Sequence, residues 1–190
     1  MDRIHSRSLV LICAAIVAGC ASMRPTTFVH PAYDFSFIER IAVVPLENLT
    51  QDRGAGERVS RYFVSELLAT EAFDVVEPGE ASKGLEALRL VRTAEMTREQ
   101  VKALGAALGA QAVILGSVTE SATIRTGATT ESIVSLDVRL VETETGETVW
   151  STTHTQKGRG VFSLVFGTSG KSLGEVTRQS VKRAVGELVK

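Results

Sequence analysis

The chain has 190 residues, of which 44% are hydrophobic, and its 21 Lys and Arg nearly balance its 22 Asp and Glu. This balance argues against a nucleic-acid or polyanion partner, because such binding draws on a clustered excess of Lys and Arg. Cys13 and Cys20 are the only cysteines, and the length is sufficient for one hydrophobic core.

The N-terminus has the pattern of a secretory signal peptide. Arg3 and Arg7 precede an apolar run over residues 9–18, which is shorter than the about 20 residues of a membrane-spanning helix. The run ends in VAGC at residues 17–20, which resembles the bacterial lipobox. We therefore predict a diacylglycerol and an N-acyl chain on Cys20, since two or three acyl chains anchor a protein firmly. The alternative is an ordinary secretory signal or an N-terminal anchor in which Cys20 is incidental.

These features divide the chain into three parts. Residues 1–19 are predicted to be a cleaved signal peptide, whose removal takes Cys13 away and leaves the exported domain without a disulfide. Residues 20–37 are predicted to be the lipidated cysteine and a flexible tether, because Pro25, Pro31 and scattered polar residues follow no clear period. Residues 38–190 are predicted to be the folded periplasmic domain. Ala21, in place of aspartate, resembles the signal that sorts lipoproteins to the outer membrane.

The first half of the folded part alternates strand and helix patterns. An apolar run closed by Pro45 predicts a buried strand. Residues 54–70 have helical spacing, and a second strand over 73–78 and a weaker helix over 81–90 follow. A capping box at residues 97–100 predicts the start of a helix that ends near Gly109.

The second half is predicted to contain antiparallel strands and a closing helix. Residues 111–118 are apolar throughout, and a strand with one solvated face follows from residue 134. A Thr-Gly turn then leads into a strand over 147–155, so these two strands form a hairpin, while 119–132 are expected to form a loop. A second capping box at 172–175 begins the last helix. The order β-α-β-α-α-β-β-β-α predicts a single-domain α/β sandwich, a mixed sheet with helices packed against it.

Three motifs resemble catalytic or nucleotide-binding patterns, and each is incomplete. The run from Gly167 to Ser172 has two residues before its Gly-Lys-Ser where a phosphate loop needs four. Gly54-Ala55-Gly56 is only the front of a dinucleotide fingerprint. His154 has no carboxylate, cysteine or second histidine at ligand spacing, so a structural role is expected. We predict no enzyme, no metal, no nucleotide and no cofactor besides the covalent lipid.

The segment VFSLVF at residues 161–166 is apolar on both alternating faces and is flanked by glycines. One interpretation is a segment that is packed into the core. The other is an exposed loop that contacts a partner protein or the membrane surface, because exposed apolar patches usually mark contacts. Phe162, Leu164 and Phe166 are its candidate interaction side chains.

Four sequence blocks follow one another between about residues 40 and 155: RIAVVPLENLTQD, FDVVEP, LGAALGAQAVILGSV and LVETETGETVW. Together they resemble the CsgG-like superfamily of bacterial envelope lipoproteins, which includes LpoB-like activators of peptidoglycan synthases. Pore-forming members insert two long hairpins. Here only 14 residues separate Val118 from Ile133 and 13 separate Gly158 from Ser172, and a transmembrane strand needs about 9–11. The pore function is therefore not expected to carry over.

These observations predict a non-enzymatic outer-membrane lipoprotein that faces the periplasm. Its folded domain is expected to bind another envelope protein, as a regulator or an assembly factor. The alternative is a homo-oligomeric structural or accessory subunit of an outer-membrane export apparatus. A nucleotide-dependent enzyme is the third class, and the incomplete phosphate loop argues against it.

Overall fold

The computed structural model of the chain describes residues 25–126, 129–158 and 170–190. The fold is an α/β sandwich built on one mixed sheet, as the sequence predicts. Its elements in chain order are β1 (Thr26–Val29), the short 3-10 helix η1 (Phe35–Phe37), β2 (Arg40–Val43), β3 (Glu47–Asn48), α2 (Ala55–Thr70), β4 (Asp74–Val75), α3 (Pro78–Ala87), α4 (Arg98–Leu108), β5 (Ala112–Thr126), β6 (Thr129–Glu142), β7 (Thr148–Lys157) and α6 (Leu173–Leu188).

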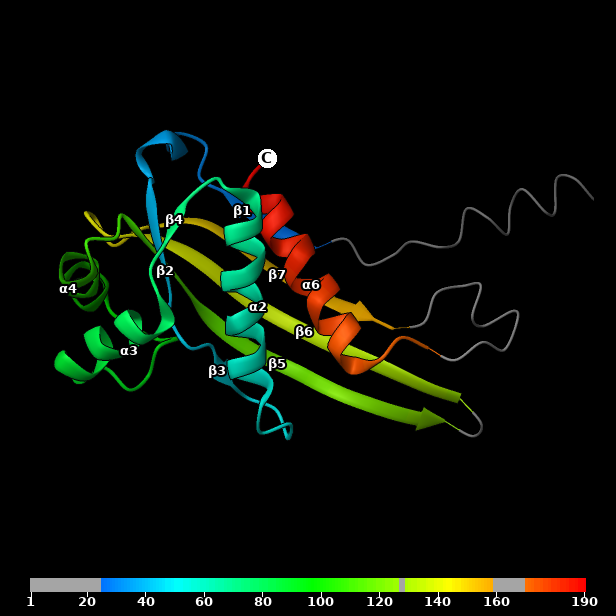
Figure 1. The fold of residues 1–190 in the computed structure, drawn as a ribbon. Coiled ribbons are helices and arrows are strands. Elements are labelled where there is room, and N and C mark those ends of the chain that lie inside the picture. The colour runs from blue at the N-terminus through cyan, green and yellow to red at the C-terminus, as the bar shows by residue number, and fades with distance from the viewer. Residues whose placement is uncertain (1–24, 127–128, 159–169) are drawn as a thin grey trace, which may run out of the picture.

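The seven-stranded sheet has a parallel side and an antiparallel side (Figure 1). Its order is β1-β7-β6-β5-β2-β4, and β3 pairs with β5 off this path. β2 pairs in parallel with β4 and β5, whereas β5, β6, β7 and β1 pair in antiparallel fashion. Most of this division follows from the connections, because parallel strands need a crossover such as α2, whereas antiparallel neighbours such as β6 and β7 can be joined by a short turn. β1 instead pairs with β7 from the other end of the chain.

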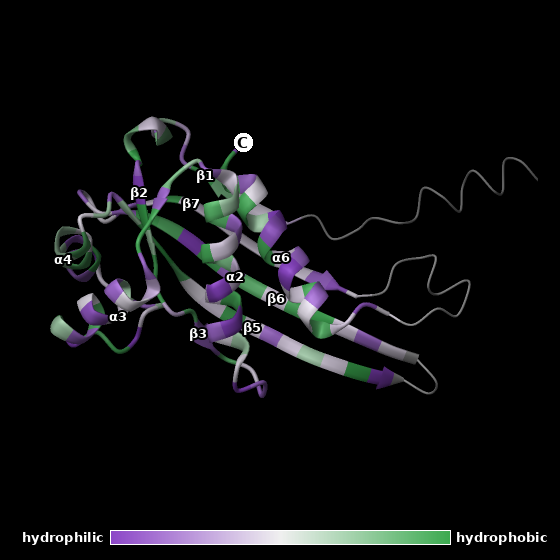
Figure 2. Cartoon of the chain, in the orientation of Figure 1, coloured by the Kyte–Doolittle hydropathy of each residue, from purple (hydrophilic) through white to green (hydrophobic). Residues whose placement is uncertain are grey.

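The two faces of the sheet are covered unequally (Figure 1). α2 and α6 lie side by side on one face, over a core whose large buried side chains include Phe63, Leu67, Leu136 and Trp150. α3 and α4 cover the opposite face only near β2 and the start of β5, where Leu104 and Leu115 are buried. In Figure 2 the hydrophobic colour accordingly concentrates where helices and sheet meet. The rest of the second face is not covered by any described helix.

Local hydrogen bonds fix the ends of α4 and α6. Thr97 and Gln100 form the predicted capping box, and so do Ser172 and Glu175. In each box a side-chain oxygen accepts from a backbone N–H that has no partner inside the helix, and the reverse contact satisfies a second N–H. Gly109 ends α4 with φ of +59°, a left-handed conformation that favours glycine.

The prediction of a loop over residues 119–132 is wrong. β5 and β6 pair continuously from Ala112 opposite Glu142 to Thr126 opposite Thr129, with a bulge between Val118 and Glu120. The segment lacks an apolar alternation because it extends past the helices, so neither of its faces needs to be apolar. Backbone pairing extends the hairpin there, and a contact between the Thr123 and Ser132 hydroxyls joins the two strands as well.

Part of the tether expected over residues 20–37 belongs to the folded body. Thr26–Val29 pair with β7 as an edge strand. Tyr33 and Phe35 pack against the larger core, with their ring centroids 5.2 Å apart in an edge-to-face arrangement. Cys20 lies outside the described residues, so the proposed lipid site stays a prediction.

His154 lies in the core between β7 and α6, in a structural position. The distance from its Nε2 to the Ser180 hydroxyl oxygen is 2.9 Å, and Nδ1 has no hydrogen-bond partner among the described residues. Burial lowers the pKa of His154; the negative charge of Glu187 opposes this shift, and the positive charge of Arg183 adds to it. The ring is therefore held in its neutral form.

We expect acid to weaken the fold through His154. The unfolded chain binds a proton at this residue near the ordinary pKa of 6.5, and the folded chain resists protonation. The His154 contribution to stability is therefore complete above pH 6.5 and is lost as the pH falls from 6.5 toward the lowered folded-state pKa. Urea midpoints from pH 8 to pH 5 measure this loss. His154→Gln, which cannot titrate, should show a smaller fall, and an equal fall in both proteins contradicts the assignment.

Candidate functional site

The candidate site lies at the far end of the β5–β6 hairpin, here called the hairpin arm (residues 119–126 and 129–132). The arm projects past α2 and α6 (Figure 1). Ile133 is the last β6 residue that pairs with β7, so the arm beyond it is two-stranded. Ile124 is an exposed apolar side chain on it. A two-stranded ribbon is only marginally stable by itself, so the base of the arm must be held.

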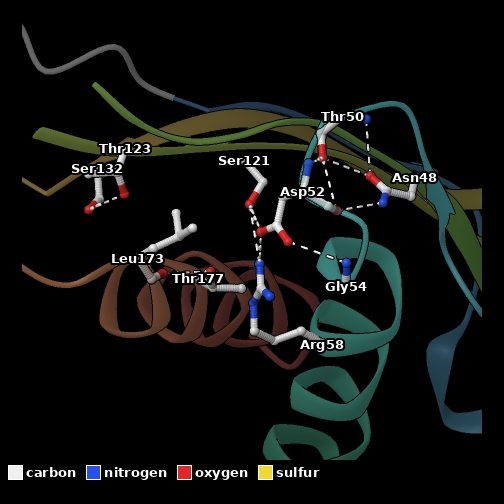
Figure 3. A network of polar contacts seen from close by, with 10 residues as sticks. All are labelled: Asn48, Thr50, Asp52, Gly54, Arg58, Ser121, Thr123, Ser132, Leu173 and Thr177. Atoms are coloured by element: carbon white, nitrogen blue, oxygen red, sulfur yellow. Dashed lines mark hydrogen bonds and ion pairs between the residues drawn. The ribbon is translucent and has the colours of Figure 1, made fainter. Parts of the chain in front are cut away.

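A polar cluster of Asp52, Arg58 and Ser121 holds this base (Figure 3). The Arg58 guanidinium donates to the Asp52 carboxylate, with which it also forms an ion pair. The Ser121 hydroxyl donates to the same carboxylate oxygen at 2.9 Å, and Arg58 donates to the Ser121 oxygen at 3.3 Å. The cluster thus joins the loop before α2, the first turn of α2 and the base of the arm.

The loop that presents Asp52 is shaped by its own side chains. Asn48 donates through Nδ2 to the Asp52 carbonyl at 2.7 Å, and Thr50 donates through its hydroxyl to Asn48 Oδ1 at 2.8 Å. The Asp52 side chain in turn accepts from the Gly54 N–H. Asn, Asp and Thr favour such turns because their short side chains bond to nearby backbone. β3 pairs with Val118 in β5, which anchors the loop beside the arm.

Close packing at Gly56 gives a structural reason for the Gly54-Ala55-Gly56 motif that resembles a dinucleotide fingerprint. A Cβ atom at this position would lie 2.4 Å from the Leu46 carbonyl oxygen. The glycine therefore allows α2 to begin against the segment between β2 and β3, and no phosphate needs to be invoked.

The charges of Asp52 and Arg58 stabilise a fixed arrangement of the cluster. The Arg58 hydrogen bond is the largest effect on Asp52 and lowers the pKa of its carboxyl; partial burial opposes this shift, and Ser121 supports it. Asp52 therefore stays ionised at neutral pH and bound to Arg58. The three residues do not form a nucleophile–base pair, since the hydroxyl faces a paired carboxylate. We assign the cluster to positioning the arm.

The candidate residues identified from the sequence stand apart from this cluster. Cys20, Phe162, Leu164 and Phe166 lie outside the described residues. Within the ranges that the structure describes, no group of three His, Cys, Asp or Glu could hold a metal ion. Across the same ranges, no helix combines the length and the apolar character needed to cross a membrane.

The strength of the Asp52–Arg58 pair at the centre of the cluster can be measured. Asp52 and Arg58 are only 24% and 29% exposed, whereas the Glu57–Arg61 pair on α2 is 71% and 74% exposed. A double-mutant cycle with Asp52→Asn and Arg58→Met should give a coupling of about 1–3 kcal/mol in urea unfolding. The same cycle on the exposed pair should give about 0.3–0.5 kcal/mol. Equal couplings would show that the Asp52–Arg58 pair is no stronger than an exposed ion pair.

The fold resembles several solved structures. PelC from Paraburkholderia phytofirmans, solved as a dodecamer, is 23% identical with a TM-score of 0.55, over 84% of this chain and 94% of that one. Lipoprotein GNA1162 from Neisseria meningitidis is 20% identical with a TM-score of 0.57, over 78% of this chain and 99% of that one. The hypothetical protein CT253 from Chlamydia trachomatis is 15% identical with a TM-score of 0.52, over 80% and 95%. At these identities the likeness concerns the fold alone.

The sequence of the chain matches one known protein family. No curated protein sequence matches the chain. Residues 28–155 match the family model of the peptidoglycan-synthase activator LpoB. An activator acts on an enzyme and is not one itself, so this match confirms the prediction that the chain is not an enzyme. It also confirms the LpoB part of the predicted resemblance, while the CsgG part stays a prediction. With about two thirds of its length matched by one family model, the chain belongs to the LpoB family.

Proposed function

We propose that the chain is an outer-membrane lipoprotein whose periplasmic domain binds and activates a peptidoglycan synthase. The observation that carries this proposal is the match of residues 28–155 to the LpoB family. The VAGC motif adds the anchor, because acyl chains on Cys20 would hold the domain at the membrane. An anchored activator reaches a nearby partner at a high effective concentration.

The open part of the sheet supports a contact with a separate protein. One row of side chains crosses it from Ser117 through Asp137 and Thr153 to Thr26, residues that lie opposite one another in the register of β5, β6, β7 and β1. These side chains are polar, and Asp137 and Thr153 are exposed. Interfaces between proteins that also exist apart are about as polar as the rest of the surface. This face and the hairpin arm are the surfaces we propose for the synthase.

A second candidate is a homo-oligomeric subunit of an export apparatus. The specific observation in its favour is the fold that the chain shares with PelC, which was solved as a dodecamer. The measured mass of the chain in solution separates a monomeric activator from a ring.

The anchor is tested by changing Cys20. We expect the protein from bacterial envelopes to weigh more than the cleaved polypeptide by the mass of its lipid, and to sediment with membranes. Cys20→Ser removes the only group at this position that can be alkylated, so the variant should lose the added mass and become extractable without detergent. An unmodified mass for the native protein contradicts the proposal.

The partner is tested by crosslinking in native envelopes followed by mass spectrometry. We expect a peptidoglycan synthase among the crosslinked proteins. If Phe162 and Phe166 contribute to the contact, the double change Phe162→Ala and Phe166→Ala should reduce its yield several-fold. A matched control changes Leu49 and Val91, which are exposed apolar residues of the described part of the chain, to alanine. Unchanged crosslinks in the first variant would exclude the segment as a contact, and the absence of any synthase would contradict the proposed function.

A further inference from the structure

The connections that follow β2 and β4 leave the sheet toward opposite faces. The chain passes from β2 to α2 on one face, and from β4 to α3 on the other face. β2 and β4 are neighbours, so the two connections separate between them, at the carboxyl ends of the strands. In open α/β sheets, ligands bind in the crevice at such a switch point. The topology therefore places a crevice between α2 and α3.

A pocket of about 410 Å³ lies in this crevice. Its wall includes Val43 in β2, Pro45 just after it, Arg61 and Val64 of α2, and Gly79 at the start of α3. Pockets that bind small ligands begin at about 300 Å³ and combine a mainly apolar wall with a few polar groups. The pocket therefore has the size and the composition of a small-ligand site.

The backbone of Val43 has unpaired groups on this side of β2. The Ile41 carbonyl accepts from the Val76 N–H at 2.9 Å, so Ile41 bonds toward β4, and the N–H and C=O of Val43, two residues on, point the same way. β4 ends at Val75, and neither group of Val43 has a hydrogen-bond partner among the described residues. Val43 is only 4% exposed, and buried backbone groups are nearly always paired. A ligand in the pocket supplies the missing partners.

Two further donors belong to the pocket wall. The Arg61 guanidinium donates to Glu57 in an exposed ion pair, and its remaining N–H groups are available to a ligand. Gly79 is the second residue of α3, and the next two N–H groups of this helix both donate to the Glu77 carbonyl. The Gly79 N–H has no such partner in the described part of the chain. Because Glu57 opposes the one cation of this wall, the site suits a ligand with a single negative charge.

We propose that this pocket binds an acylated apolar amino acid with a free carboxylate, which is the group that ends a peptide chain. The ligand N–H donates to the Val43 carbonyl and a carboxylate oxygen accepts from the Val43 N–H, as in a hydrogen-bonded pair of antiparallel residues. The carboxylate also accepts from Arg61 and from the Gly79 N–H. Opposed residues share one face of a sheet, so the ligand side chain lies beside Val43, on the face where Val64 packs.

Nuclear magnetic resonance with matched ligands tests this site. The described core residues lie between Ile38 and Leu188, so an isotope-labelled chain from Ala21 to Lys190 keeps both cores. We expect N-acetyl-leucine at millimolar concentrations to shift the N–H signals of Val43 and Gly79 saturably. N-acetyl-leucinamide lacks the charge, isocaproate lacks the N–H and N-acetylglycine lacks the apolar side chain, so each should bind at least fivefold more weakly. No saturable shift at these two signals, or equal binding of the amide, overturns the proposal.

Two arginines supply matched variants. Arg61 and Arg92 are 74% and 67% exposed, and each forms an ion pair with a glutamate three or four positions away. Arg61 lines the pocket and Arg92 does not. Since both side chains are exposed, neither change disturbs the core. We expect Arg61→Met to weaken N-acetyl-leucine binding at least tenfold and Arg92→Met to change it less than twofold, and equal effects contradict the assignment.

A longer ligand separates the two sources of this chemistry. Acetyl-Ala-Ala-Leu carries the same carboxyl end on a short chain. Binding at least as tight as that of N-acetyl-leucine assigns the site to the end of a peptide, and weaker binding assigns it to the single acylated amino acid. The site goes beyond the proposed function, since it shares no residue with the hairpin arm or with the polar row on the open sheet. These solutions contain no synthase, so their failure is distinct from a failure of the crosslinking.

Discussion

A β-strand advances about 3.3 Å per residue and an α-helix about 1.5 Å, and this difference determines how much of the sheet the helices cover. β5 has 15 residues and spans about 50 Å, whereas α2 and α6 have 16 residues each and span about 24 Å. Helices of this length can bury only about half of the long hairpin. The covered part carries Val134, Leu136 and Val138, and the same face changes to the buried Ser121 and Ser132 at the edge of the cover. Beyond them Thr123 and Ile124 are exposed, so only the far part of the hairpin arm lies outside the helical cover.

An uncovered arm is useful for binding only if its position is defined. Asp52 and Arg58 provide this definition from the loop before α2 and from α2 itself, and they meet Ser121 where the helical cover ends. The contact fixes the base of the arm, and Thr123 and Ile124 farther along β5 are exposed. Preorganisation of this kind lowers the entropy cost of binding, since the arm need not be ordered by its partner. The polar cluster thus connects the packing of the core to an interaction role.

The sequence predicts the part of this structure that depends on local chemistry. The fold class, the order of the main elements and both capping boxes follow from apolar periodicity and from residues within four positions of one another. The family resemblance rests instead on four sequence blocks between about residues 40 and 155. The extension of β5 past Val118 could not be predicted, because a two-stranded arm in water has no apolar face to reveal it. The pairing of Asp52 with Ser121 could not be predicted either, since 69 positions separate them and only the parallel pairing of β3 with β5 brings them together. The turn-forming residues between Asn48 and Asp52 were the available signal that this loop carries a fixed side chain.

The two ends of the sheet differ in a way that bears on assembly. β4 closes one end with two residues, and its exposed Asp74 forms an ion pair with Arg40. Short edge strands and charged side chains protect a sheet against pairing with another chain. β1 closes the other end with four exposed residues, two of which are Phe28 and Val29. Exposed apolar side chains on an edge strand favour the addition of a further strand. Among the described elements, the β1 edge is therefore the less protected end of the sheet.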